Sequence, residues 1–181
     1  MNRKSFVIGA IAAACSLALP AIATSPESSS PDPQVQRAMA LLKQKTAALG
    51  APSLTGSTVV EGQAVPVLRF GTSVMNNNEQ IVDAVRATVG GGMTATLFAR
   101  KGDDFIRVAT NVPSPNDPHH RALGTRLDPQ GPVIARIRKG STFYGPVLIL
   151  GTRYITGYAP IQSAAGQVIG IYYVGYKAAG D

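Results

Sequence analysis

The sequence has little of what most catalytic and metal centres are built from. In 181 residues it contains one cysteine, no tryptophan, two histidines and ten acidic residues. It has no GxSxG nucleophile turn, HExxH helix or phosphate-binding glycine loop, and its few carboxylates offer little for a general acid and base pair. The sequence therefore predicts a protein that is not an enzyme and that uses no cofactor.

The two histidines are adjacent, at His119 and His120, with Asp117 as the nearby carboxylate. Adjacent loop positions rarely direct both rings at one metal ion, so no metal site is expected. A metal-dependent enzyme that uses both histidines is kept as an alternative hypothesis.

The first residues are typical of an export signal. Two basic residues are followed by an apolar stretch from Phe6 to Leu19 and a small-residue end at Ala23. The pattern predicts a signal peptide over residues 1–23, cleaved before Thr24, and a periplasmic or secreted protein.

Two alternatives for this segment are a retained membrane anchor and lipid attachment at Cys15. If the signal is cleaved, the mature chain has no cysteine and its stability comes from packing alone. A serine- and proline-rich stretch at 24–31 predicts a flexible leader, and residues 32–181 are enough for a single domain.

Basic residues outnumber acidic ones. The net charge of +7 falls to +5 when Arg3 and Lys4 of the signal are subtracted, and the remaining positive residues are scattered. A scattered positive charge favours small anions over nucleic acid, which needs a clustered basic stripe. A merely solubilising charge is the alternative interpretation.

The mature chain is expected to begin with an amphipathic helix of about 17 residues, with Asp32 as its cap, Pro33 in its first turn and Gly50 after its end. The residues that recur at helical spacing are Val35, Ala38, Met39, Leu42, Thr46 and Leu49.

A hairpin is predicted over Thr58–Phe70, and a capping box at Asn76 and Glu79 predicts the start of a second helix that ends at three glycines, 90–92. The later predicted segments are strands at 93–100 and 105–110, a long loop from 111, a short helix from Pro132, and strands at 146–151, 153–161 and 167–175. Sequential hairpins require an antiparallel sheet, and with helices on one side of it the fold class is α+β.

Spaced sequence landmarks also carry a resemblance. They are FARKGDDFIRVAT from Phe98, RALGTRLDP from Arg121, YGPVLILGTRYITGYAPI from Tyr144 and GQVIGIYYVG from Gly166, with weaker likeness in VPVLRFG and IVDAV. Together they resemble the single Cache sensor domains of the fused Cache 3 and Cache 2 type, over most of the mature chain.

The resemblance implies a PAS-like fold, with a long N-terminal helix packed on a curved antiparallel sheet of about five to seven strands. It also implies a small-molecule ligand, bound between the sheet and the loops that cross it. Such domains typically form the extracytoplasmic part of chemoreceptors and sensor kinases, and their first helix often mediates dimerisation. This chain resembles a stand-alone exported version, and Ala159 and Ser163 stand where relatives commonly carry acidic residues.

Several polar residues of the predicted sheet are candidate ligand-binding residues. In the strand 105–110, alternation places Arg107 with Phe105 and Ala109 on one face and Thr110 on the other. In the strand 153–161, Tyr154, Thr156 and Tyr158 share a face and offer rings and hydroxyl groups. Ordinary packing of these tyrosines is the alternative.

Three further candidates, Arg121, Arg126 and Tyr144, lie in or beside the long loop. An arginine there could hold a carboxylate through two parallel hydrogen bonds, although an arginine that only faces solvent is the commoner case. All eight candidates are Arg107, Thr110, Arg121, Arg126, Tyr144, Tyr154, Thr156 and Tyr158.

The leading hypothesis is an extracytoplasmic module that binds or senses a small anionic metabolite, such as an organic acid. It would act in signal transduction through a membrane receptor or sensor kinase, with no nucleic acid as partner and with a possible homodimer through the first helix. The rival hypothesis is a protein-interaction module whose core is filled and which docks on such a receptor or kinase.

Overall fold

The computed structural model describes residues 31–179. The predicted signal peptide at 1–23 and nearly all of the predicted leader at 24–31 lie outside the described residues. Among the helices that are described, none has the length and apolar character needed to cross a bilayer.

Helix α1 (Pro33–Ala47) begins where the cap predicts. The Asp32 carboxylate accepts hydrogen bonds from the backbone N–H groups of Gln34, at 2.9 Å, and Val35, at 3.0 Å. The helix has 15 residues, fewer than predicted, because its last carbonyls bond three residues ahead and the chain turns away, which leaves Leu49 39% exposed. Its buried residues are Val35, Ala38, Met39, Leu42 and Thr46.

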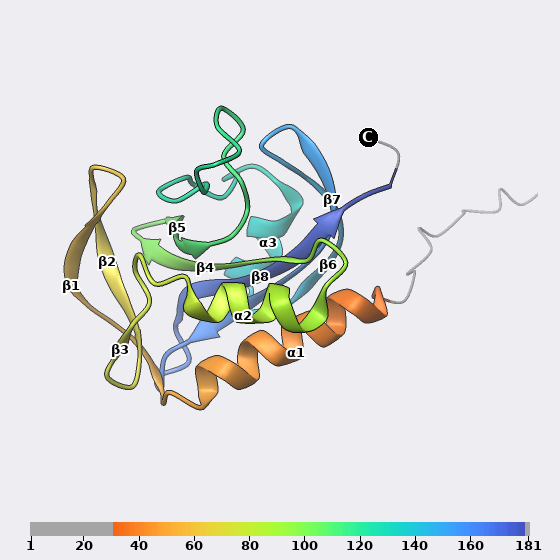
Figure 1. The fold of residues 1–181 in the computed structure, drawn as a ribbon. Coiled ribbons are helices and arrows are strands. Elements are labelled where there is room, and N and C mark those ends of the chain that lie inside the picture. Colours follow the sequence, from red (N-terminus) through yellow and green to blue (C-terminus); the bar gives the residue numbers. More distant parts are fainter. Residues whose placement is uncertain (1–30, 180–181) are drawn as a thin grey trace, which may run out of the picture.

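A small three-stranded sheet follows, with the order β1-β2-β3. Its strands are β1 (Pro52–Val60), β2 (Gln63–Phe70) and β3 (Ser73–Val74). The predicted hairpin is confirmed, but β1 begins at Pro52 instead of Thr58. Figure 1 shows this sheet projecting beside the main body of the domain.

Helix α2 (Gln80–Val89) forms without the predicted capping box. The Asn76 side chain instead accepts a hydrogen bond from Leu68 N at 2.8 Å and donates one to Pro66 O at 3.0 Å. The predicted capping box is therefore wrong. The Asn76 side chain is 7% exposed and is used to bond its loop to β2, so it is not available to cap α2.

The main sheet has five antiparallel strands in the order β5-β4-β8-β7-β6. They are β4 (Thr94–Lys101), β5 (Asp104–Thr110), β6 (Phe143–Ile149), β7 (Thr152–Gln162) and β8 (Val168–Lys177). All five strands agree with the predicted segments to within a few residues. The last strand, β8, pairs with both β4 and β7 and joins the two hairpins into one sheet (Figure 1).

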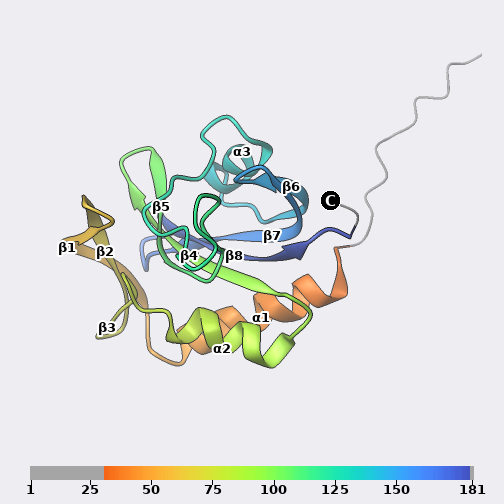
Figure 2. The ribbon, with the colours of Figure 1, turned by 45° about the horizontal axis from the view of Figure 1, so that its top comes forward.

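Helices cover both faces of this sheet. Helices α1 and α2 lie on one face, and α3 (Pro132–Arg138) lies with the long loop on the other (Figure 2). The expectation that all helices gather on one side is therefore wrong for α3. Its apolar residues Val133, Ile134 and Ile137 are buried against the opposite face of the sheet.

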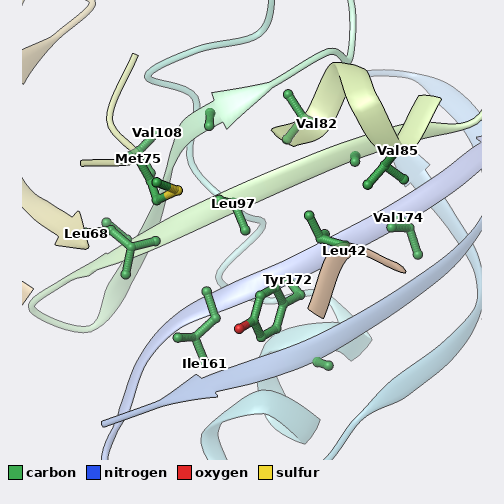
Figure 3. Close-up of a cluster of buried hydrophobic side chains, with 14 of the residues drawn as sticks. Leu42, Leu68, Met75, Val82, Val85, Leu97, Val108, Ile161, Tyr172 and Val174 are labelled. Atoms are coloured by element: carbon green, nitrogen blue, oxygen red, sulfur yellow. The ribbon is translucent and has the colours of Figure 1, made fainter. Parts of the chain in front are cut away.

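Each face has a separate apolar core. The helix-face core, shown in part in Figure 3, includes Leu42, Leu68, Met75, Val82, Val85, Leu97, Val108, Ile161, Tyr172 and Val174. The loop-face core consists of Phe98, Phe105, Val112, Ala122, Leu127, Val133, Ile134, Ile137, Ile149, Tyr154, Tyr158, Ile171 and Tyr173. The second core contains the aromatic rings that surround Arg107.

A β-bulge in β5 changes which residues share a face. Successive residues of β4 pair with Ala109 and with Arg107, which leaves Val108 as an extra residue in β5. Both Val108 and Ala109 belong to the helix-face core. The prediction that Ala109 shares the face of Arg107 is therefore wrong, and it is Thr110 that shares this face.

Candidate functional site

The long loop runs back along β5 and covers the edge of the sheet. Arg107 exchanges two backbone hydrogen bonds with this loop, donating to Thr125 O at 2.9 Å and accepting from Gly124 N at 2.9 Å. Leu127 N donates to Phe105 O at 2.9 Å. The loop thus acts as an additional edge strand and encloses the Arg107 side chain.

Arg107 is buried, with 3% of its surface exposed. Its Cζ atom lies 4.9 Å from the centre of the Phe98 ring, and its Nη1 donates to Thr125 Oγ1 at 2.6 Å. Its Nε is buried and has no hydrogen-bond partner. Among the described residues no carboxylate forms an ion pair with it.

The electrostatics of Arg107 follow from this burial. Removal from water lowers the pKa of Arg107 from its usual value, and the oxygens of Tyr158, Tyr173 and Tyr154 oppose that effect. The guanidinium remains protonated, since arginine does not lose its proton in proteins. The loop-face core therefore holds an uncompensated positive charge.

A cavity of about 390 Å³ opens beside this charge. The Arg107 cavity, as we call it, is lined by Arg107, Arg126, Leu127, Asp128, Gly131, Pro132, Val133, Pro146, Val147, Leu148, Ile149, Leu150 and Tyr158. Its inner end is formed by buried side chains, Arg107 and Tyr158, while Arg126, Asp128 and Leu148 are exposed and surround the mouth. The walls are mostly aliphatic, and a ligand there would meet one cation at the inner end.

Tyr158 and Tyr173 pack as a pair of rings across β7 and β8, with centroids 4.9 Å apart. Burial raises the pKa of the Tyr158 phenol far above its usual value, so the group stays neutral. A neutral phenol that lines the cavity can donate a hydrogen bond to a ligand oxygen.

Three of the predicted residues line the Arg107 cavity, namely Arg107, Arg126 and Tyr158. Arg126 lies at the mouth, where Nη1 is 3.2 Å from the Asp104 carboxylate.

Thr110, Tyr154 and Thr156 lie on the same face of the sheet but outside the Arg107 cavity. Thr110 Oγ1 lies 2.6 Å from Thr96 Oγ1 and accepts from Val112 N. Thr156 donates to Gly145 O at 2.7 Å. Both threonine hydroxyls are thus occupied by bonds within the protein.

Arg121 is held by the second helix. Its Nη1 and Nη2 bond both oxygens of Asp83, at 2.8 and 3.0 Å, and its Nε lies 2.9 Å from Glu79 Oε2. The hydrogen bond from Arg121 holds the pKa of the Asp83 carboxyl below its usual value. The arginine fastens the loop to α2 and is not directed into the Arg107 cavity.

Tyr144 lies on the opposite face of the sheet, packed against the helix-face core. It pairs with Gly157 of β7, one residue out of phase with Tyr158. Because side chains alternate along a strand, the Tyr144 ring is separated from the Arg107 cavity by the sheet.

Sequence reasoning missed the residues that hold Arg107 in place. Thr125 orients the guanidinium and itself donates to Ala122 O at 2.7 Å, and Phe98 supplies the ring beneath it. The pairing of Phe98 with Arg107 depends on the bulge at Val108, and the position of Thr125 depends on the path of the loop. Neither feature leaves a periodic signal in the sequence.

The two histidines lie in an exposed part of the loop, where His120 Nδ1 is 2.6 Å from Asp117 Oδ2. In residues 31–179, no group of three or more histidine, cysteine, aspartate or glutamate side chains is placed to hold a metal ion. The metal-dependent alternative has no supporting geometry in this part of the chain.

Comparison with known families gives one result. The family model of the Cache 3/Cache 2 fusion domain matches residues 21–180, and no curated protein matches the sequence. Cache domains in general are extracytoplasmic sensor modules that bind small molecules and act through receptors, and they are not enzymes. Since the match covers most of the sequence and the described part is α+β with helices on antiparallel sheets, the chain belongs to the Cache 3/Cache 2 fusion domain family.

Proposed function

We propose that this chain is an exported module that binds a small anionic metabolite, such as an organic acid, in the Arg107 cavity. Ligand binding would be reported to a membrane receptor or sensor kinase. The observation that carries the proposal is a buried guanidinium beside an open cavity, with an unpaired Nε and no carboxylate partner in the described chain.

An unpaired buried charge is costly. Desolvation of an ion costs several kcal/mol even after relaxation, and natural proteins normally pair such a charge. The Phe98 ring recovers part of this cost, about 2 kcal/mol for a desolvated contact. A bound anion would supply the missing partner.

The free part of Arg107 has the shape that a carboxylate needs. Nη1 is engaged by Thr125, while Nε and Nη2 form the side-on fork of the guanidinium, of which Nε is covered in the ligand-free protein. A carboxylate can accept two parallel hydrogen bonds from such a fork, and Tyr158 lies on the same cavity wall as a further donor. The aliphatic walls would cover the rest of a small ligand.

The size of the cavity favours ligand binding over the rival hypothesis of a filled interaction module. A volume of about 390 Å³ lies in the range of roughly 300–1,000 Å³ that is common for small-molecule sites.

A thermal-shift screen of the purified mature protein tests the proposal. The panel should contain mono- and dicarboxylates, amino acids, organic cations and neutral apolar compounds. A ligand at 100 times its dissociation constant adds about 2.7 kcal/mol, which is roughly 5 to 10 °C for a domain of this size.

The control is a matched pair of variants. Arg107→Met should abolish the shift, whereas Arg37→Met, on the exposed side of α1, should retain it. Binding of cations or apolar compounds alone, or an unchanged shift in Arg107→Met, would overturn the anionic assignment.

A further inference from the structure

A second cleft lies on the loop face of the main sheet, away from the Arg107 cavity. It has a volume of about 530 Å³ and lies between the start of β4, the end of β8, the glycines after α2 and the loop up to Arg121. We call it the polar cleft, and the residues that matter here are Arg86, Thr94, His119, His120, Tyr154 and Lys177. It shares no lining residue with the Arg107 cavity.

Tyr154 forms part of the floor of the polar cleft. The side chain is 2% exposed, and its hydroxyl makes no hydrogen bond to any described residue. Its neighbour Thr94 is different, since Thr94 Oγ1 donates to Gly175 O at 2.7 Å and lies 3.0 Å from the Tyr173 hydroxyl. Tyr154 is therefore the unused donor of this floor, and burial, which raises its pKa, keeps it protonated.

The walls of the polar cleft are positive. Arg86 and Lys177 are exposed, lie on different elements and form no ion pair among the described residues. The neighbouring acids are already paired, since Asp83 is bound through both oxygens by Arg121 and Asp117 lies 2.6 Å from His120 Nδ1. No aspartate or glutamate lines the cleft, so its potential is set by the cations.

We propose that the polar cleft is a second binding site, which takes a small anion with two or more charges carried on oxygen atoms. Inorganic phosphate and tricarboxylates share this chemistry. Arg86 and Lys177 contact the anion from two walls, and the Tyr154 hydroxyl donates a hydrogen bond from the floor. The Arg107 cavity, with one buried cation and aliphatic walls, selects a different kind of anion.

The proposal is tested by titrating the mature protein with inorganic phosphate and, separately, with citrate, at constant ionic strength because exposed charges are screened by salt. Amide NMR spectra should show shifts concentrated at Gly91, Gly92 and Lys177. The double variant Arg86→Met/Lys177→Met should bind about tenfold more weakly or worse, since each exposed cation contributes up to about 1 kcal/mol. Tyr154→Phe should weaken binding by about threefold or more, and Arg37→Met should have no effect.

Three results would overturn the proposal. They are no saturable binding of either anion at millimolar concentration, amide shifts confined to the residues around the Arg107 cavity, and variants that bind like the Arg37→Met control. Amide spectra of the free variants check that each is folded. Tyr154→Phe keeps the ring and its packing, so the proposal stays testable if the double variant is unstable.

Discussion

Replacing Arg107 by methionine should separate ligand binding from folding. Methionine has a similar length, and its thioether packs well against a ring such as Phe98. The substitution removes an unpaired buried donor, which costs the wild type about 1–3 kcal/mol, and the larger desolvation cost of the charge. It also removes the bond to Thr125 and the cation–π contact, together worth about 2–4 kcal/mol.

The balance of these effects favours the variant. Thr125 keeps its own hydrogen bond to Ala122 O, so the substitution leaves no new unsatisfied group on the loop. Replacement of buried charges by apolar side chains of similar size is often neutral or stabilising by 1–4 kcal/mol. We expect the free energy of unfolding of the ligand-free Arg107→Met protein to equal that of the wild type or to exceed it by about 1–2 kcal/mol.

Urea unfolding, with and without the carboxylate found in the thermal-shift screen, measures both effects. The wild type should gain about 2.7 kcal/mol at 100 times the dissociation constant, and the variant should gain nothing. Arg107→Lys is the second comparison, because it keeps the charge but cannot form the two parallel hydrogen bonds. It should bind more weakly than the wild type.

A loss of more than about 2 kcal/mol of stability in ligand-free Arg107→Met, together with retained ligand binding, would contradict this expectation. Arg107 would then be a structural residue of the loop-face core. Equal loss of stability and of binding in Arg107→Ala would point the same way, although alanine also leaves an empty volume.

Three further predictions concern how the domain is held together. Arg121→Ala should lower the free energy of unfolding by about 1 kcal/mol at pH 7, allowing for solvent screening of a pair whose side chains are 31% and 44% exposed. Arg121 lowers the pKa of Asp83 in the folded protein, so the loss of stability should be complete above the unfolded pKa of 3.8 and should shrink as the pH falls below that value. Urea midpoints of the wild type and the variant that differ by the same amount at pH 7 and at pH 3 would contradict this prediction. Asp32→Ala removes the cap of α1 and should cost about 1 kcal/mol, with faster amide exchange in the first turn; unchanged exchange there would refute the capping role. Gly170→Ala places a methyl group against the backbone carbonyl of Phe98 and should lower the free energy of unfolding by more than about 2 kcal/mol. A melting temperature equal to that of the wild type would show instead that β4 and β8 can move apart at no cost.

The elements of this fold could be predicted because each carries a local signal. Asp32 and Pro33 mark the start of α1, and the glycines near 151 and 166 separate three runs with strand character. Such signals depend on neighbours in the sequence and on backbone conformation, so they are visible without the tertiary structure.

The faces of the strands could be predicted only in part. Tyr154, Thr156 and Tyr158 share a face as alternation requires, because β7 pairs regularly with β6 through this stretch. In β5 the bulge at Val108 breaks the alternation. Because of this one extra residue, each later residue of the strand points to the opposite face from the one that alternation predicts. Nothing in a stretch such as FIRVAT distinguishes a bulged strand from a regular one.

The roles of individual polar side chains were the hardest to predict. Asn76 fits a capping box by spacing, yet it bonds the backbone of β2, and Arg121 is paired with Asp83 from a distant helix. Leu68 lies 8 residues from Asn76, and Asp83 lies 38 residues from Arg121. Both separations exceed that of a helix cap, so the tertiary fold decides which hydrogen bond each side chain makes.

The two cores of the sheet have different physical character, and this difference is where function is expected. The helix-face core is made of aliphatic and aromatic side chains packed between α1, α2 and the sheets, and it can stabilise the domain without any ligand. The loop-face core breaks the usual rule for interiors, because it encloses the Arg107 guanidinium without a counter-ion and leaves a cavity beside it. A sequence that is otherwise consistent keeps such a costly arrangement mainly where it is used, since a filled and uncharged core would be more stable. Because the helix-face core supplies stability without a ligand, removing the charge from the loop face by Arg107→Met should leave the melting temperature equal to or above that of the wild type and abolish the ligand response in the same protein.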